Sequence, residues 1–245
     1  MSLHKLKALA KEQGFEIKKV PLNFVGIRKL NSDPDKFDEV FHLIFKAPVI
    51  VLKPGSKSKT EIDKVYGFQK IYTALVRIED CENLSLTVDG IAGPKTLEAL
   101  IHYTNHYVSA NVSWEFEFTT RSGNYYLRKP LSKKGTAMLV SPGQYKYVRG
   151  RHKTQEAFVQ GEPFKVFRDN DKDDRSEKTD VTEVGYFGIN LHRRKFGLNS
   201  DTIGRWSAGC QVFRYGKEFQ MVVNLADGLI SLKKQFVFPY TLLDE

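Results

Sequence analysis

Hydrophobic and polar residues alternate along much of the chain, and this pattern predicts a fold rich in β-strands. The clearest case is the segment 112–119, where apolar and polar side chains alternate with period two. Strand-like apolar runs also cover 21–28 and 39–45, and the second run continues through 49–52. Further strands are predicted at 125–128, 136–140, 144–149, 156–160, 163–168, 184–191 and 236–238.

Other segments space their apolar side chains three or four residues apart, which predicts helices. This spacing is clearest over 61–78. A second helix is predicted from Pro94 to about 106, because proline suits the first turn of a helix. A short helix is expected at the N-terminus, and a late helix fits 216–234.

The helical pattern interrupts the strand pattern, which predicts an inserted module. The segment 53–59 contains Pro, Gly and Ser without an apolar anchor, as linkers do. Strand-like segments lie on both sides of the helices. We therefore expect a mostly β domain of the α+β class, formed by 1–54 and 111–245, with a small helical module inserted at 55–110.

Composition and charge narrow the function classes. The 245 residues are 41% hydrophobic and 27% charged, as in ordinary globular proteins. No apolar stretch approaches the ~20 residues that span a bilayer, so we expect no membrane insertion. The N-terminus lacks a secretory signal pattern, which predicts synthesis in the cytoplasm. The net charge of +9 favours a polyanionic partner, whether nucleic acid, anionic membrane or cell-wall polymer.

Two motif classes are absent or weak. No glycine-rich phosphate-binding motif appears, so no nucleotide cofactor is indicated. The aromatic and basic run 145–149 has the residue types that stack nucleic-acid bases, but it fits a strand with two different faces better. Alternating carboxylates at 169–174 suit calcium, yet the loop lacks the glycine and terminal glutamate of an EF-hand, which favours a solvated acidic loop.

The candidate chemistry lies near the C-terminus, where a predicted strand delivers His192 and a tight turn delivers Cys210. A thiolate is the reactive form of cysteine, and a nearby imidazole lowers the thiol pKa and takes the proton. Gly209 lets the backbone approach a substrate carbonyl closely, and N–H groups of the turn are candidate oxyanion donors. The other cysteine, Cys81, is interpreted as a small buried hydrophobic residue.

These residues resemble the signature of the L,D-transpeptidase catalytic domain, the YkuD family: His, 14 to 17 residues, Ser or Thr, His, Gly, Cys. Here fourteen residues separate His192 from the run Ser207-Ala208-Gly209-Cys210, and Ala208 stands where the family has its second histidine. The resemblance implies a β-sandwich in which Cys210 is the nucleophile and His192 its base. It also implies that the backbone carbonyl of Arg193 orients His192, and that no metal or organic cofactor takes part.

Two further assignments complete this candidate site. Ser207 and Gly209 are expected to shape the turn and the oxyanion site. His152 is a candidate substrate-binding substitute for the missing second histidine, but the favoured interpretation is a lone surface histidine.

A second resemblance covers about 64–106. The run 88–100 resembles the D-G-x-x-G-P-x-T-x-x-A-L core of peptidoglycan-binding helical domains, with Asp89 and Gly93 at its turn and Phe68-Gln69 on the preceding helix. This implies a wall-binding role for Asp89 and Gly93, the alternative being a purely structural relic. The segments 119–123 and 135–145 are also similar to phage-associated and Bacteroidetes proteins that bind peptidoglycan.

Together the two resemblances imply a peptidoglycan-active cysteine enzyme that attacks stem-peptide amide bonds through a thioacyl-enzyme. The missing signal pattern favours a lytic, endolysin-like or effector-like peptidase that reaches the bacterial cell wall after release or secretion. Three alternatives stay open: a cross-linking L,D-transpeptidase, a non-catalytic peptidoglycan-binding protein with a decayed site, and, more distantly, a basic nucleic-acid binder.

Overall fold

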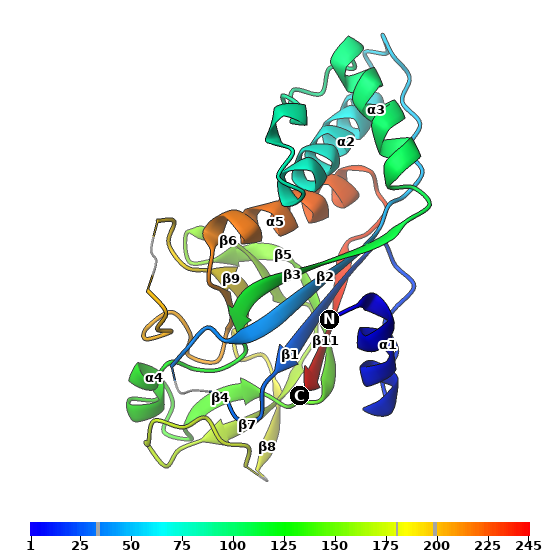
Figure 1. The fold of residues 1–245 in the computed structure, drawn as a ribbon. Helices are drawn as coiled ribbons and strands as arrows, with labels where there is room; N and C mark the ends of the chain where they lie inside the picture. Colours follow the sequence, from blue (N-terminus) through cyan, green and yellow to red (C-terminus); the bar gives the residue numbers. More distant parts are fainter. Residues whose placement is uncertain (33–34, 180, 198–199) are drawn as a thin grey trace.

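The computed structural model describes residues 1–32, 35–179, 181–197 and 200–245. The described part is a mixed α+β fold with a closed barrel of eight strands, a separate three-stranded sheet and five α-helices (Figure 1). The α+β class predicted from the sequence is therefore confirmed.

The barrel strands follow the order β1-β11-β5-β6-β9-β10-β3-β2, and β2 pairs back onto β1. Aromatic side chains fill the interior. The ring of Phe24, for example, lies 5.4 Å from that of Phe41 and 4.9 Å from that of Phe158, and all three are fully buried. A barrel wall packed in this way holds the side chains at its rim in fixed positions. The strands are β1 (Leu22–Arg28), β2 (Glu39–Lys46), β3 (Asn111–Thr119), β5 (Gly143–His152), β6 (Gln155–Gln160), β9 (Leu191–Arg193), β10 (Gln211–Phe213) and β11 (Val237–Asp244).

This closed barrel replaces the β-sandwich that the sequence led us to expect. The C-terminal strand, predicted only over 236–238, extends to Asp244 and lies between β1 and β5, parallel to the first and antiparallel to the second. It closes the sheet on that side. Inward and outward side chains alternate along a strand in sandwiches and barrels alike, so the sequence pattern did not distinguish them.

The remaining elements surround the barrel. The strands β4, β7 and β8 form a small antiparallel sheet at one end (Figure 1). Residues 55–110, which contain α2 and α3, form the helical segment. Helix α5 lies between the barrel and this segment, and α2 packs along α5. The bounds are β4 (Thr136–Leu139), β7 (Phe164–Asp169), β8 (Thr182–Gly185), α1 (Leu3–Glu12), α2 (Lys59–Ile78), α3 (Pro94–His106), α4 (Asn124–Arg128) and α5 (Gly216–Ser231), with a 3₁₀ turn at Glu82–Leu84.

Two glycines allow α2 and α5 to pack closely. A Cβ on Gly67 would lie 2.8 Å from the carbonyl oxygen of Gly228, and a Cβ on Gly228 would lie 2.6 Å from that of Gly67. The apolar side chains of α2 and α5 belong to the same buried cluster as the barrel interior. The helical segment is therefore joined to the barrel through shared core packing, with α5 between them.

Three predicted strands differ from the structure. Residues 125–128 belong to helix α4, whose first turn forms where the amide of Tyr126 donates to the carbonyl of Gly123. The segment 184–191 is split between β8 and β9, because Gly188 adopts φ +70° and breaks the extended backbone between them. The segment 49–52 keeps its alternating burial but forms no strand.

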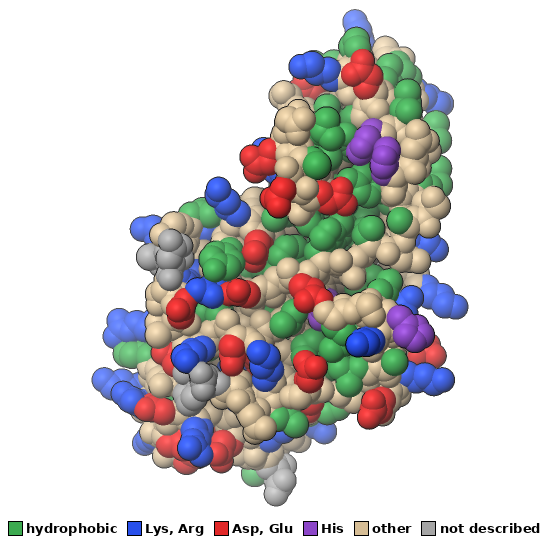
Figure 2. Space-filling view, viewed as in Figure 1, with side chains coloured by type: hydrophobic (Ala, Val, Ile, Leu, Met, Phe, Trp, Pro, Cys, Tyr) green, Lys and Arg blue, Asp and Glu red, His purple; other side chains and the backbone are tan. Residues whose placement is uncertain are grey.

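Basic side chains are dispersed over the face of the molecule shown in Figure 2. Figure 2 shows Lys and Arg side chains spread over the visible face and interspersed with Asp and Glu. Within the described ranges, no helix is both long enough and apolar enough to traverse a lipid bilayer.

Candidate active site

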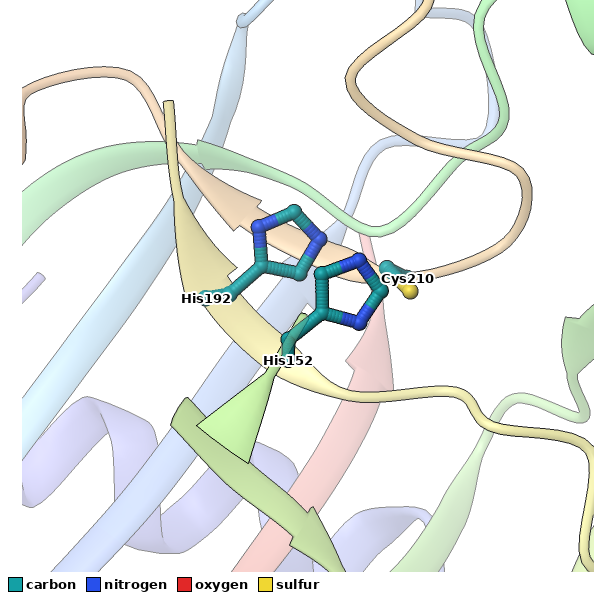
Figure 3. Close-up of side chains that lie close together, drawn as sticks. All are labelled: His152, His192 and Cys210. Carbon is teal, nitrogen blue, oxygen red and sulfur yellow. The ribbon is translucent and has the colours of Figure 1, made fainter. Parts of the chain in front are cut away.

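Three side chains from separate parts of the chain meet at the rim of the barrel: His152 at the end of β5, His192 on β9 and Cys210 immediately before β10 (Figure 3). Strands β9 and β10 are parallel neighbours, with Leu191 opposite Gln211. This register brings His192 and Cys210 to the same end of the strand pair. One ligand-type atom from each of the three side chains lies within 4.8 Å of the other two.

His192 is held in one orientation with one nitrogen left unpaired. Its side chain is 3% exposed, and Nδ1 lies 3.1 Å from the backbone carbonyl oxygen of Arg193. Since a carbonyl only accepts, the proton resides on Nδ1 and the lone pair on Nε2, which is buried without a hydrogen-bond partner. The contact with Arg193 is the one that the family resemblance implies. Burial, and secondarily the neighbouring His152, lower the pKa of His192 to about 4, so the imidazole is neutral near pH 7.

His152 stacks on His192. The two ring centroids are 4.4 Å apart and the ring planes differ by 1°. The side-chain amide nitrogen of Asn190 lies 2.9 Å from Nδ1 of His152, an arrangement in which Nδ1 accepts and Nε2 carries the proton. Burial, followed by the charge of Lys153, lowers the pKa of His152. His152 is thus a neutral histidine within the cluster and not a lone surface residue.

Cys210 is 8% exposed, and its thiol lies 3.5 Å from the carbonyl oxygen of Gly188. Burial raises the pKa of this thiol to about 11, and the backbone of Asn190 and the charge of Lys153 oppose the increase only in part. The sequence-based expectation of a lowered thiol pKa is therefore not met in the free protein, because desolvation outweighs the nearby donors. The resting pair is a neutral thiol beside a neutral imidazole.

The turn before the cysteine is fixed by Ser207 and Gly209. The buried hydroxyl of Ser207 donates to the carbonyl oxygen of Cys210 at 2.8 Å and accepts from the amide of Gly209 at 3.1 Å. Gly209 adopts φ +112°, and a Cβ there would lie 1.9 Å from the carbonyl oxygen of Ala137. Both residues shape the turn. The amide of Gly209 is already bonded, so it does not point to an oxyanion as we had expected.

The cluster lines a pocket of about 230 Å³ that is open to solvent. Ala208 lies in its wall, so the position of the family's second histidine faces the same space as Cys210. The lining also includes five aromatic and cationic side chains: Tyr126, Trp206, Lys153, Arg193 and Arg205. Of these five, only Arg193 was assigned to the site from the sequence, and only through its backbone carbonyl. The other four come from helix α4 or from turns and loops, whose position depends on the tertiary fold.

Asp89 and Gly93, proposed as substrate-binding residues, lie elsewhere. They line a separate pocket of about 290 Å³ in the helical segment. The carboxylate of Asp89 accepts from the backbone amide of Ile91 and from the side-chain amide of Gln69, both at 2.8 Å. These bonds hold the pKa of Asp89 below its usual value. Asp89 therefore builds the loop before α3, and the structure does not bring it to Cys210.

Comparison with protein-family models, with curated proteins and with solved structures finds no match for this chain.

Among the described residues, His152, His192 and Cys210 form the one group of three side chains close enough to share a metal ion. A nitrogen lone pair lies in the plane of its imidazole ring. Because the two rings are parallel and stacked, a single ion cannot lie in both planes, and one ring would have to rotate first. In the acidic loop, carboxylates instead accept from the loop's own backbone, as when Asp173 accepts from Arg175. The stacked arrangement suits proton transfer better than metal ligation.

Proposed function

We propose that the protein is a peptidoglycan-active cysteine peptidase that cleaves a stem-peptide amide bond through a thioacyl-enzyme. The observation that carries the proposal is the unpartnered Nε2 of the buried His192, in a cluster with the Cys210 thiol on the wall of an open pocket. An oriented imidazole with a free lone pair beside a thiol is the arrangement that nucleophilic catalysis requires. In this proposal the barrel is a YkuD-like catalytic domain and 55–110 is its peptidoglycan-binding-like module.

In the first step, the thiol of Cys210 turns from the Gly188 carbonyl toward Nε2 of His192 and transfers its proton as the sulfur attacks the amide carbonyl. Catalytic hydrogen bonds are often long in the free enzyme and shorten when substrate binds. The cationic imidazolium then remains bonded to the Arg193 carbonyl through Nδ1. The C–N bond breaks as the imidazolium returns the proton to the leaving amine, which leaves an acyl group on the sulfur.

His152 has a different role from His192 because its proton resides on the other nitrogen. With Nδ1 occupied by Asn190, its Nε2–H is a donor. We propose that this N–H donates a hydrogen bond to the carbonyl oxygen of the substrate, which becomes negatively charged during the attack. This assignment replaces the amide of Gly209 and compensates for the alanine at position 208.

Charge around the pocket favours water over an amine as the second reactant. Lys153, Arg193 and Arg205 line the pocket, and none of its lining residues is acidic. An acceptor amine approaches as an ammonium ion, which like charges repel, whereas water is unaffected. Hydrolysis and a lytic outcome follow, and the cross-linking alternative is disfavoured.

Digestion of purified peptidoglycan, followed by mass spectrometry of the muropeptides, tests the proposal. New free stem peptides are expected with the wild-type protein and with Cys81→Ala, because Cys81 lies outside the pocket. Cys210→Ala should abolish them. New cross-links in place of free peptides would assign transfer instead of hydrolysis, and product formation by Cys210→Ala would exclude the mechanism.

Ala208 and the raised thiol pKa favour a second candidate, a non-catalytic wall-binding protein. Sedimentation with insoluble peptidoglycan separates the two. Binding without any product from the wild-type protein would support the second candidate.

A further inference from the structure

The pocket beside Cys210 has an unbalanced charge. Three cationic side chains line it, Lys153, Arg193 and Arg205, and its lining contains no Asp or Glu. Both histidines are neutral near pH 7, because burial lowers their pKa values. Positive charge that is gathered around a concave site without an internal counter-charge attracts and orients an anionic ligand.

Within the described ranges, none of the three cations forms an ion pair with a carboxylate. Arg193 stacks on the ring of Phe196, 3.7 Å from its centroid, and donates to the backbone carbonyl of Arg194. The carboxylate of Glu156 interacts with the charge of Arg193 at longer range, but Glu156 is itself paired with Arg149. Its charge is therefore not neutralised inside the protein.

Arg205 is held against the wall of the pocket by an aromatic pair. Its guanidinium lies 3.9 Å from the ring centroid of Tyr125, and that ring packs edge-on against Tyr126, which also lines the pocket. A guanidinium stacked through one face keeps its N–H edge available for a planar bidentate acceptor such as a carboxylate.

Lys153 lines the same pocket as the reacting groups. It occupies the tight turn between β5 and β6 with φ +55°, directly after His152. Its charge acts on His152, His192 and Cys210 alike. An anion at Lys153 would therefore lie next to the amide that Cys210 attacks.

We propose that this pocket selects a substrate with a free carboxylate beside the scissile amide, bound by Lys153 and Arg205, and that it discriminates against the same peptide with that carboxylate amidated. The inference rests on the proposed function. It adds a charge requirement on the substrate that neither cysteine chemistry nor a peptidoglycan target demands by itself.

Two synthetic stem peptides that differ only in a carboxylate or a carboxamide at this position test the inference. Turnover of the acid is expected to exceed that of the amide by about tenfold or more, as for a charged hydrogen bond. Lys153→Asn and Arg205→Gln should each reduce this ratio several-fold, and Lys153→Arg should retain it. Asparagine tolerates the left-handed backbone at position 153, so the turn is kept. The matched control is Lys233→Asn, an exposed lysine with φ +56° at the end of α5 that should leave the ratio unchanged.

Binding to Cys210→Ala separates this inference from the proposed function. It is followed by tryptophan fluorescence, because Trp206 lines the pocket. Tighter binding of the acid without turnover by the wild-type protein would contradict the catalytic proposal and leave the anionic subsite standing. Equal turnover and equal binding of the two peptides would overturn the subsite, even if both are cleaved in a Cys210-dependent reaction.

Discussion

The imidazole rings of His152 and His192 stack face to face, 4.4 Å apart and within 1° of parallel, although 39 intervening residues separate them in the sequence. The stack covers one face of the buried ring that serves as the base in our proposal. It also places a second neutral histidine in the lining of the pocket that contains Ala208.

Replacing His152 by alanine should raise the pKa of His192. That pKa is lowered to about 4 first by burial and then by His152, and the substitution weakens both causes by removing the ring and admitting water. The acidic limb of the pH–rate profile should therefore move from near pH 4 toward neutral pH, so that activity at pH 6 falls relative to activity at pH 8.

The rate at optimal pH should also decrease by about 10²-fold, because an oxyanion donor is lost. His152→Gln retains a donor and should recover part of this rate. A decrease in rate with no movement of the acidic limb would show that the stack does not influence His192.

Alkylation of Cys210 in the free protein should be slow at neutral pH, because its thiol is buried. Because its thiol pKa is raised to about 11, the thiolate fraction is small at pH 7 and increases about tenfold per pH unit up to pH 10. Cys81 is partly exposed, not buried as the sequence led us to expect. Iodoacetamide should therefore modify Cys81 before Cys210 at neutral pH, as measured by mass spectrometry of the two cysteine peptides. This reverses the order expected for a pre-formed thiolate. A rate for Cys210 that levels off near pH 7 would indicate an ion pair with histidine.

Local sequence patterns predicted the strand and the turn that carry His192 and Cys210, but not the residues that form the pocket around them. The strand before His192 and the turn before Cys210 were evident from apolar spacing and from a glycine beside the cysteine, because both depend on neighbouring residues. The contact of His192 with Arg193 followed from the family resemblance, and the structure contains it.

Contacts between residues far apart in the sequence could not be predicted from local patterns. Lys153 reaches the site only because β5 pairs with β6 and β6 with β9, and Arg205 only because Tyr125 belongs to a helix and not to the predicted strand. The pKa of Cys210 was predicted in the wrong direction, because proximity of a histidine is visible in a motif whereas desolvation depends on the whole fold.

Gly209→Ala should destabilise the protein strongly. The substitution forces a side chain into φ +112° and places its Cβ 1.9 Å from the carbonyl oxygen of Ala137, so strand β4 must shift. We expect the free energy of unfolding to fall by about 3 kcal/mol or more in urea denaturation. Gly55→Ala is the matched control, because Gly55 has φ +76° with nothing within 4 Å of a Cβ and should cost about 1 kcal/mol. Equal losses for the two variants would show that the contact with Ala137 relaxes freely.

Gln69→Ala should separate wall attachment from catalysis. The buried side chain of Gln69 accepts from the amides of Asp89 and Gly90 and donates to Asp89, Ile91 and Thr96, so one residue holds the loop that precedes α3. Removing it leaves several buried polar groups unpaired, at a cost of about 2–3 kcal/mol. The loss should be concentrated in the helical segment, where hydrogen exchange of the α3 amides should accelerate.

Sedimentation with insoluble peptidoglycan should weaken in this variant, whereas kcat on a soluble stem peptide should stay within about twofold of wild type, because the pocket of Cys210 contains no residue of the helical segment. Asp89→Asn is the control: its amide oxygen can still accept from Ile91, so the loop and the sedimentation should be retained. If Asp89→Asn abolishes sedimentation while α3 remains protected from exchange, the carboxylate itself contacts the wall. A parallel loss of kcat in Gln69→Ala would instead show that the helical segment and the barrel act as one unit through the packing of α2 on α5.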